Sequence, residues 1–198
     1  PVVKKMRLMA AVRPGIFDPR IAAKMGASID RISGGRFCVN IVNGTRPQEH
    51  NMYGRWIESD DGRYQQMHEF IKVMKGLWTE DKFTLDGDFY KIKDGIMPTR
   101  SVATPHPPFF AASRAEDGMN VVAQECDCWF VNYDKDRANY DASLQRIARE
   151  TAMMEERAKA YGRKMSYGIN GIVIIGKTEE EAQAMADEHV RVAGAMQV

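Results

Sequence analysis

The sequence predicts an α/β protein built on a parallel sheet. Apolar stretches typical of buried strands alternate along the chain with segments of helical periodicity, which is the pattern of consecutive βα units. The alternation amounts to about five βα units with one β-hairpin between them. A closed barrel of eight such units takes about 250 residues, and this chain has 198. We therefore expect a single domain over residues 1–198 that is either an open sheet or part of a barrel.

The first predicted strand covers residues 5–12, and a helix follows it. Asp18 is an N-cap acceptor followed by a proline at the first helical position. Apolar side chains then follow helical spacing, at Ile21, Ala22, Met25, Ile29 and Ile32. The Ser33-Gly34-Gly35 turn is typical of a helix end.

The second predicted strand, residues 37–42, carries a polar residue within an apolar run. A buried amide without a partner costs roughly 1–3 kcal/mol. The Asn40 side chain must therefore meet either another part of the protein or a ligand.

A polar loop is predicted over residues 43–62, followed by the clearest helix of the chain. Its apolar side chains recur at helical spacing, at Met67, Phe70, Ile71, Met74, Leu77 and Trp78. Residues 83–85 and 89–92 flank an Asp86-Gly87 turn signal and indicate a hairpin.

The C-terminal half continues the alternation of strands and helices. After a proline-rich connector at 105–108, the predicted elements are a strand at 109–112, a helix at 116–125, a strand at 128–131, a helix at 137–161 and a strand at 167–175. Thr178 and Glu181 have the spacing of a capping box, which opens a last helix.

Composition excludes several classes of protein. The 28 basic residues nearly balance the 27 acidic ones and form no stripe, so no nucleic-acid partner is expected. The apolar runs are shorter than the roughly 18 residues of a membrane span, and no signal peptide is recognisable. Three cysteines without scaffold spacing favour a reducing cytoplasm. Cys126 and Cys128 fit buried positions better than a metal site, so no metal is predicted.

Ligands of parallel α/β sheets bind beyond the carboxyl ends of the strands. The loop after the second strand is the richest such segment, with Asn40, Asn43, Thr45, Arg46, Glu49, His50, Arg55, Arg63 and Tyr64 within it or beside it. A loop of this composition is either solvated or, because long irregular loops are often functional, part of a site. The turn at Ser113 and Arg114 suits an anion at a helix N-terminus or a simple serine N-cap.

Four ordered segments resemble a known family. They are PRIAAKMGASIDRISGGRFCVNIVNG, GRYQQMHEFIKVMKGLWTEDKFTLDGDFYKIKD, PPFFAASRAEDGMNVVAQECDCWFV and RKMSYGINGIVIIGKTEEEAQAMADEHV. They are similar to bacterial luciferase-like flavin-dependent monooxygenases, nearest the alkanesulfonate, sulfone and pyrimidine branches. The resemblance implies a TIM (β/α)8 barrel, here incomplete because the first three βα units and the closing strands of the family are not matched.

The resemblance also implies an activity and its partners. Members of the family use reduced FMN, supplied by a separate flavin reductase, and O₂ to form a flavin peroxide that oxidises a small substrate. For this chain we expect a small sulfone, a sulfonate or a related compound. The open edges of an unclosed sheet also lead us to expect identical subunits that cover them.

Residue roles follow from the resemblance as well. Flavin contacts are implied at Asn40, Glu49, Arg63 and Tyr64. A further contact position, a serine in the pyrimidine branch, aligns with Ala115, so that Ser113 or Arg114 would have to take its place. No catalytic residue is assigned.

The substrate position differs from that of the alkanesulfonate branch. Asn170 and Ile172 stand where that branch carries an arginine and a histidine, which favours a neutral sulfone, amide or ring compound. Two other functions stay open: hydride transfer with a deazaflavin cofactor, and a non-catalytic flavin-binding fragment.

Overall fold

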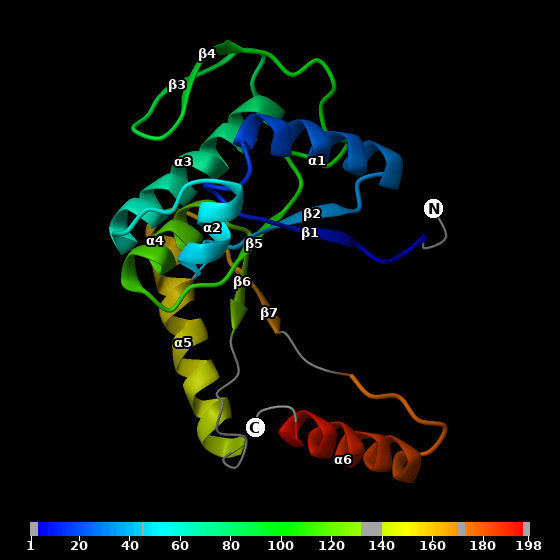
Figure 1. The fold of residues 1–198 in the computed structure, drawn as a ribbon. Coiled ribbons are helices and arrows are strands. Elements are labelled where there is room, and N and C mark those ends of the chain that lie inside the picture. Colours follow the sequence, from blue (N-terminus) through cyan, green and yellow to red (C-terminus); the bar gives the residue numbers. More distant parts are fainter. Residues whose placement is uncertain (1–3, 45, 132–139, 170–172, 196–198) are drawn as a thin grey trace.

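The computed structural model describes residues 4–44, 46–131, 140–169 and 173–195. Within them, five parallel strands form one sheet in the order β1-β2-β5-β6-β7, and two antiparallel strands form a separate hairpin (Figure 1). The sheet strands are β1 (Leu8–Val12), β2 (Phe37–Ile41), β5 (Phe109–Ala111), β6 (Cys128–Val131) and β7 (Ser166–Ile169). The outer strands β1 and β7 do not pair with each other, so the parallel sheet does not close within the described residues, as predicted.

Helices alternate with these strands as the sequence predicts. They are α1 (Pro19–Ser33), α2 (Pro47–Tyr53), α3 (Asp60–Thr79), α4 (Glu116–Glu125), α5 (Tyr140–Ala160) and α6 (Glu179–Ala195). Along one face of the sheet, α3 packs between α1 and α4, and α5 packs on α4 (Figure 1). None of the helices in the described ranges is both long enough and apolar enough to cross a membrane.

The core lies between the sheet and these helices. The apolar side chains predicted for α3 are all buried, which confirms that helix and its face. They pack against the alternate strand residues that point to the same side, among them Val39, Ile41, Phe109 and Trp129. The indole Nε1 of Trp78 donates a 2.9 Å hydrogen bond to the carbonyl oxygen of Ala23 and joins α3 to α1.

The buried face of α1 differs from the prediction. Its caps are as expected, but three of its large apolar side chains are exposed: Ile21 (55%), Met25 (52%) and Ile32 (75%). Its buried residues include no large apolar side chain; they are Pro19, Ala22, Ala23, Gly26, Ala27, Asp30 and Ser33. A Cβ at Gly26 would lie 2.9 Å from ring atoms of both Phe37 and Trp78, so the helix approaches its neighbours too closely for larger side chains.

Three predicted boundaries are corrected. The first strand begins at Leu8 rather than residue 5. The loop predicted at 43–62 contains α2 and the first residues of α3; α2 begins without a side-chain cap and buries only His50, so it has no apolar periodicity to detect. The last strand ends at Ile169 in the described residues, and Val173 and Ile175, predicted to extend it, are each 80% exposed.

The hairpin and the last helix form as predicted. Strands β3 (Phe83–Asp86) and β4 (Lys91–Gly95) are antiparallel, with Leu85 opposite Ile92. The Thr178 hydroxyl accepts a 3.3 Å hydrogen bond from the backbone N–H of Glu181, which confirms the capping role of Thr178.

A buried carboxylate ties the sheet to the segment that leads into β5. Asp30 of α1 is fully buried and accepts hydrogen bonds from the backbone N–H groups of Phe37 (3.3 Å), Val102 (2.7 Å) and Ala103 (2.8 Å). The carboxylate thus serves as the hydrogen-bond acceptor that the backbone does not provide for these N–H groups.

Candidate functional site

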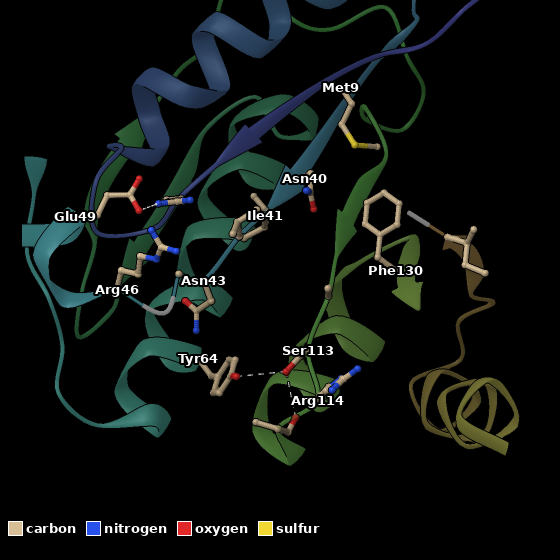
Figure 2. A pocket seen from close by; sticks show the side chains of 16 residues that line it. Met9, Asn40, Ile41, Asn43, Arg46, Glu49, Tyr64, Ser113, Arg114 and Phe130 are labelled. Atoms are coloured by element: carbon tan, nitrogen blue, oxygen red, sulfur yellow. Dashed lines mark hydrogen bonds and ion pairs between the residues drawn. The ribbon is translucent and has the colours of Figure 1, made fainter. Parts of the chain in front are cut away.

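An open cavity of about 950 Å³ lies at the carboxyl ends of the parallel strands (Figure 2). It is lined by Met9, Arg13, Asn40, Ile41, Val42, Asn43, Gly44, Arg46, Glu49, Tyr64, Ala112, Ser113, Arg114, Ala115, Phe130 and Ile169. Six of the residues to which the resemblance gives a flavin contact are therefore brought together: Asn40, Glu49, Tyr64, Ser113, Arg114 and Ala115.

Asn40 lies near the end of β2 on the sheet face opposite the helices. It is in register with Ala11 of β1 and Phe110 of β5, so the three side chains share that face. Its amide is half-buried, points into the cavity and makes no hydrogen bond to another described residue (Figure 2). The amide is thus left available to a ligand.

One side of the cavity is charged. The Glu49 carboxylate on α2 forms an ion pair with the guanidinium of Arg13, the residue that follows β1. The hydrogen bond from Arg13 is the main cause that holds the pKa of Glu49 below its ordinary value. Arg46 lies on the same side and, within the described residues, makes no hydrogen bond or ion pair through its side chain (Figure 2).

A buried imidazole, that of His50, holds the short helix α2 in place. His50 packs edge-on against Trp56 with ring centroids 5.2 Å apart, and its Nδ1 lies 3.3 Å from the Arg46 carbonyl oxygen. Gly44 has a φ of +75° and leaves the space the ring occupies, since a Cβ there would be 2.3 Å from a ring carbon of His50. This packing fixes where Glu49 and Arg46 lie on the cavity wall.

The opposite side of the cavity is the turn between β5 and α4. The Ser113 hydroxyl is within donating distance of the Tyr64 hydroxyl (3.4 Å) and of the Ala115 carbonyl oxygen (3.3 Å) (Figure 2). The N-cap of α4 is Ala115, which has no side-chain cap, so the reading of Ser113 as a simple N-cap is wrong. Arg114 is exposed beside it and forms no ion pair with another described residue.

Arg63 does not line this cavity. Its guanidinium donates to the carbonyl oxygens of Ile57 (2.6 Å) and Glu58 (2.9 Å), pairs with Asp60 and lies 4.3 Å from the centre of the Trp56 ring. In this arrangement it orders the loop between α2 and α3. Asn170 and Ile172, the two expected substrate residues, lie outside the described residues.

Among the lining residues that the sequence did not single out are Met9, Phe130 and Arg13. Met9 and Phe130 come from strand positions on the same sheet face as Asn40, and strand alternation was the signal that could have found them. The Phe130 ring lies 5.4 Å from that of Phe110. Arg13 is the first residue beyond β1, in a segment that the strand-end rule covers.

The cysteines are buried and unpaired. Cys38, Cys126 and Cys128 are free thiols, and burial raises the pKa of Cys128 to about 11. Their burial confirms the reading of Cys126 and Cys128 as interior residues. The described part of the chain contains no group of three His, Cys, Asp or Glu side chains that could hold a metal ion.

Comparisons with known proteins identify the family of this chain. Residues 3–197 match the family described as "Luciferase-like monooxygenase". The chain is 34% identical over 186 residues to an FMNH(2)-dependent dimethylsulfone monooxygenase of Pseudomonas putida, covering 93% of this chain and 49% of that protein. It is 31% identical to the protein of the same name in Pseudomonas fluorescens (strain Pf0-1), covering 91% and 47%.

A solved structure shows the same fold. The EDTA monooxygenase of Chelativorans sp. BNC1 superposes with a TM-score of 0.77 at 22% identity, over 94% of this chain and 49% of that one. The chain thus spans about half the length of the relatives it matches. From the family match over nearly all its residues, it belongs to the luciferase-like monooxygenases.

Proposed function

We propose that this protein is an FMNH2-dependent monooxygenase that oxidises a small organosulfur compound with O₂, and that the chain supplies the flavin-binding side of its barrel. The observation that carries the proposal is the Asn40 amide, unpartnered among the described residues, in a cavity at the strand ends. The names of the two dimethylsulfone monooxygenases to which the chain is similar support the same reading.

The residues present fit a flavin mononucleotide. The cavity volume of about 950 Å³ is within the range of small-molecule sites. Of the arginines that line the cavity, Arg13 is paired with Glu49. The guanidinium groups of Arg46 and Arg114 would be available to an anion such as a phosphate. Met9 and Phe130 provide an apolar wall of the kind that an aromatic ring system packs against.

Each group then has a definable task. Asn40 would hydrogen-bond a polar edge of the flavin ring, and the Ser113 and Tyr64 hydroxyls with Arg114 would hold the phosphate. Met9 and Phe130 would exclude water from the ring. Reduced FMN, when bound, supplies the electrons that activate O₂, and a separate flavin reductase would deliver it.

A neutral sulfone is the substrate we propose. An amide at position 170 and an alkyl side chain at 172 provide no charge to compensate a sulfonate, and burying an unpaired anion is costly. We also propose that the protein is a cytoplasmic homo-oligomer.

The test is oxygen consumption in a coupled assay. The protein, a flavin reductase, FMN and NADH are mixed with dimethyl sulfone, uracil or a short alkanesulfonate at equal concentration. We expect O₂ uptake that depends on the protein and is fastest with the sulfone. Absence of substrate-dependent uptake, with reduced FMN still bound, would contradict oxygenation and favour a hydride-transfer enzyme; absence of flavin binding would contradict the proposal altogether.

A further inference from the structure

Gly118, in the first turn of α4, leaves a space that two side chains of the cavity wall fill. A Cβ at this position would lie 2.1 Å from Oγ of Ser113, 2.8 Å from Cβ of Ser113 and 2.4 Å from Cε1 of Tyr64. These separations are far below van der Waals contact, so any larger residue would force both side chains to move. Ser113 and Tyr64 can approach to 3.4 Å only because position 118 has no side chain.

The Ser113 backbone is fixed from the other side. Its carbonyl oxygen accepts a 3.3 Å hydrogen bond from the indole Nε1 of Trp129, which is itself buried on β6. Ser113 is buried as well. With the backbone held in this way, the position of Oγ depends on the space at Gly118.

We propose that Gly118 is the positioning residue that makes the site selective for a phosphorylated flavin over riboflavin. This inference rests on the proposed function, because it assigns Ser113, Tyr64 and Arg114 to the phosphate. Gly118 acts through Ser113 and Tyr64 by letting both hydroxyls face the same point. Riboflavin has the same ring and ribityl chain but no phosphate, so its binding does not depend on that arrangement.

One of the two carboxylates in the first turn of α4 is neutralised by an ion pair, and the other, Asp117, is exposed to solvent. Glu116, which would repel a phosphate at this helix end, is paired with Arg157 at 2.6 Å. The Arg157 guanidinium also donates a 2.5 Å hydrogen bond to Asn120 Oδ1, which holds it against α4. Arg114 is thus the cation of the turn that remains for a ligand.

The experiment compares FMN with riboflavin, both reduced and titrated anaerobically. In Gly118→Ala we expect the dissociation constant for reduced FMN to rise at least about tenfold, as the loss of one charge-assisted hydrogen bond predicts, and that for reduced riboflavin to change less than about twofold. Equal weakening of both ligands, or no weakening of either, would overturn the inference while leaving the proposed function in place. Failure of the unaltered protein to bind either flavin would overturn both.

A double-mutant cycle separates positioning from general damage. Ser113→Ala alone should show the same selective loss of FMN, and adding it to Gly118→Ala should produce little further loss because the two act through one hydroxyl. Additive losses would contradict the coupling. Gly26→Ala is the control, because Gly26 lies on α1 away from the cavity and its new Cβ would lie 2.9 Å from rings of Phe37 and Trp78. This variant should leave the ratio of the two dissociation constants unchanged.

A third variant covers failure to fold. If Gly118→Ala does not fold, the triple variant Ser113→Gly, Tyr64→Ala and Gly118→Ala removes the atoms of both side chains that the new methyl group would meet. Recovery of the thermal unfolding transition in that variant, with FMN affinity equal to that of the Ser113→Gly and Tyr64→Ala double variant, would support the assignment. No recovery would overturn it.

Discussion

The Glu49 carboxylate on α2 is ion-paired with the Arg13 guanidinium at the end of β1, across one side of the cavity. The pair joins a short helix that has little apolar burial of its own to the rigid sheet. Together with the packing of His50 against Trp56, the pair determines how α2 borders the cavity.

Replacing Glu49 by Gln should loosen α2. The amide keeps the size of the side chain but loses the charge that pairs with Arg13 and holds α2 at the cavity. We expect faster proteolytic cleavage between residues 46 and 55, measured by limited digestion. We also expect a higher dissociation constant for reduced FMN. Glu58→Gln, an exposed position outside the cavity, is the matched control. Unchanged digestion would show that His50 alone holds the helix.

Asn40→Leu tests the amide in the cavity. Leucine is of similar size but cannot hydrogen-bond a flavin, so we expect reduced FMN to bind less tightly by roughly 1–3 kcal/mol. An anaerobic titration measures the dissociation constant. Asn51→Leu on the exposed side of α2 should leave it unchanged. Equal affinities in all three proteins would remove Asn40 from the flavin site.

Asp30→Ala should destabilise the fold without touching the cavity. It leaves three backbone N–H groups, those of Phe37, Val102 and Ala103, without their acceptor. The expected loss is roughly 3 kcal/mol or more in the free energy of unfolding, because each buried unsatisfied donor is costly. Urea denaturation measures it. Asp88→Ala, an exposed aspartate, serves as control and should change stability by less than about 0.5 kcal/mol.

The pH dependence of stability should carry a contribution from Glu125. Burial opposes its ionisation, but hydrogen bonds from His68 (3.0 Å) and Lys75 (2.8 Å) outweigh burial and hold its pKa below the ordinary 4.5. Because the folded-state pKa is the lower one, this contribution is complete above the unfolded-state value and is lost as the pH falls through the folded-state value.

Glu125→Gln should therefore flatten this acid limb. We expect the urea midpoint of the variant to fall less than that of the unaltered protein as the pH drops from about 5.5 to about 3. Glu179→Gln, on the exposed start of α6, should follow the unaltered protein. Parallel curves for all three would show that the cluster does not contribute to acid stability.

The sequence by itself determined the alternation of strands and helices and the face of α3. These features depend on local periodicity, and α3 contributes six large apolar side chains whose spacing has one interpretation. It also indicated where a site would lie, because the carboxyl ends of parallel strands meet at one edge. The oddness of Asn40 in an apolar run was a local signal of the same kind.

Only the tertiary structure decided which faces are close enough to require small residues. The periodicity of α1 favoured Ile21, Met25 and Ile32, yet the helix buries its alanines and Gly26 because Phe37 and Trp78 approach to near contact. The same holds in the cavity, where the absence of a side chain at Gly118 leaves space for Ser113 and Tyr64. Packing also decides that the Arg63 guanidinium donates to a loop carbonyl oxygen and does not line the cavity. These outcomes depend on the distance between segments far apart in the chain, and that distance is set by packing rather than by local periodicity.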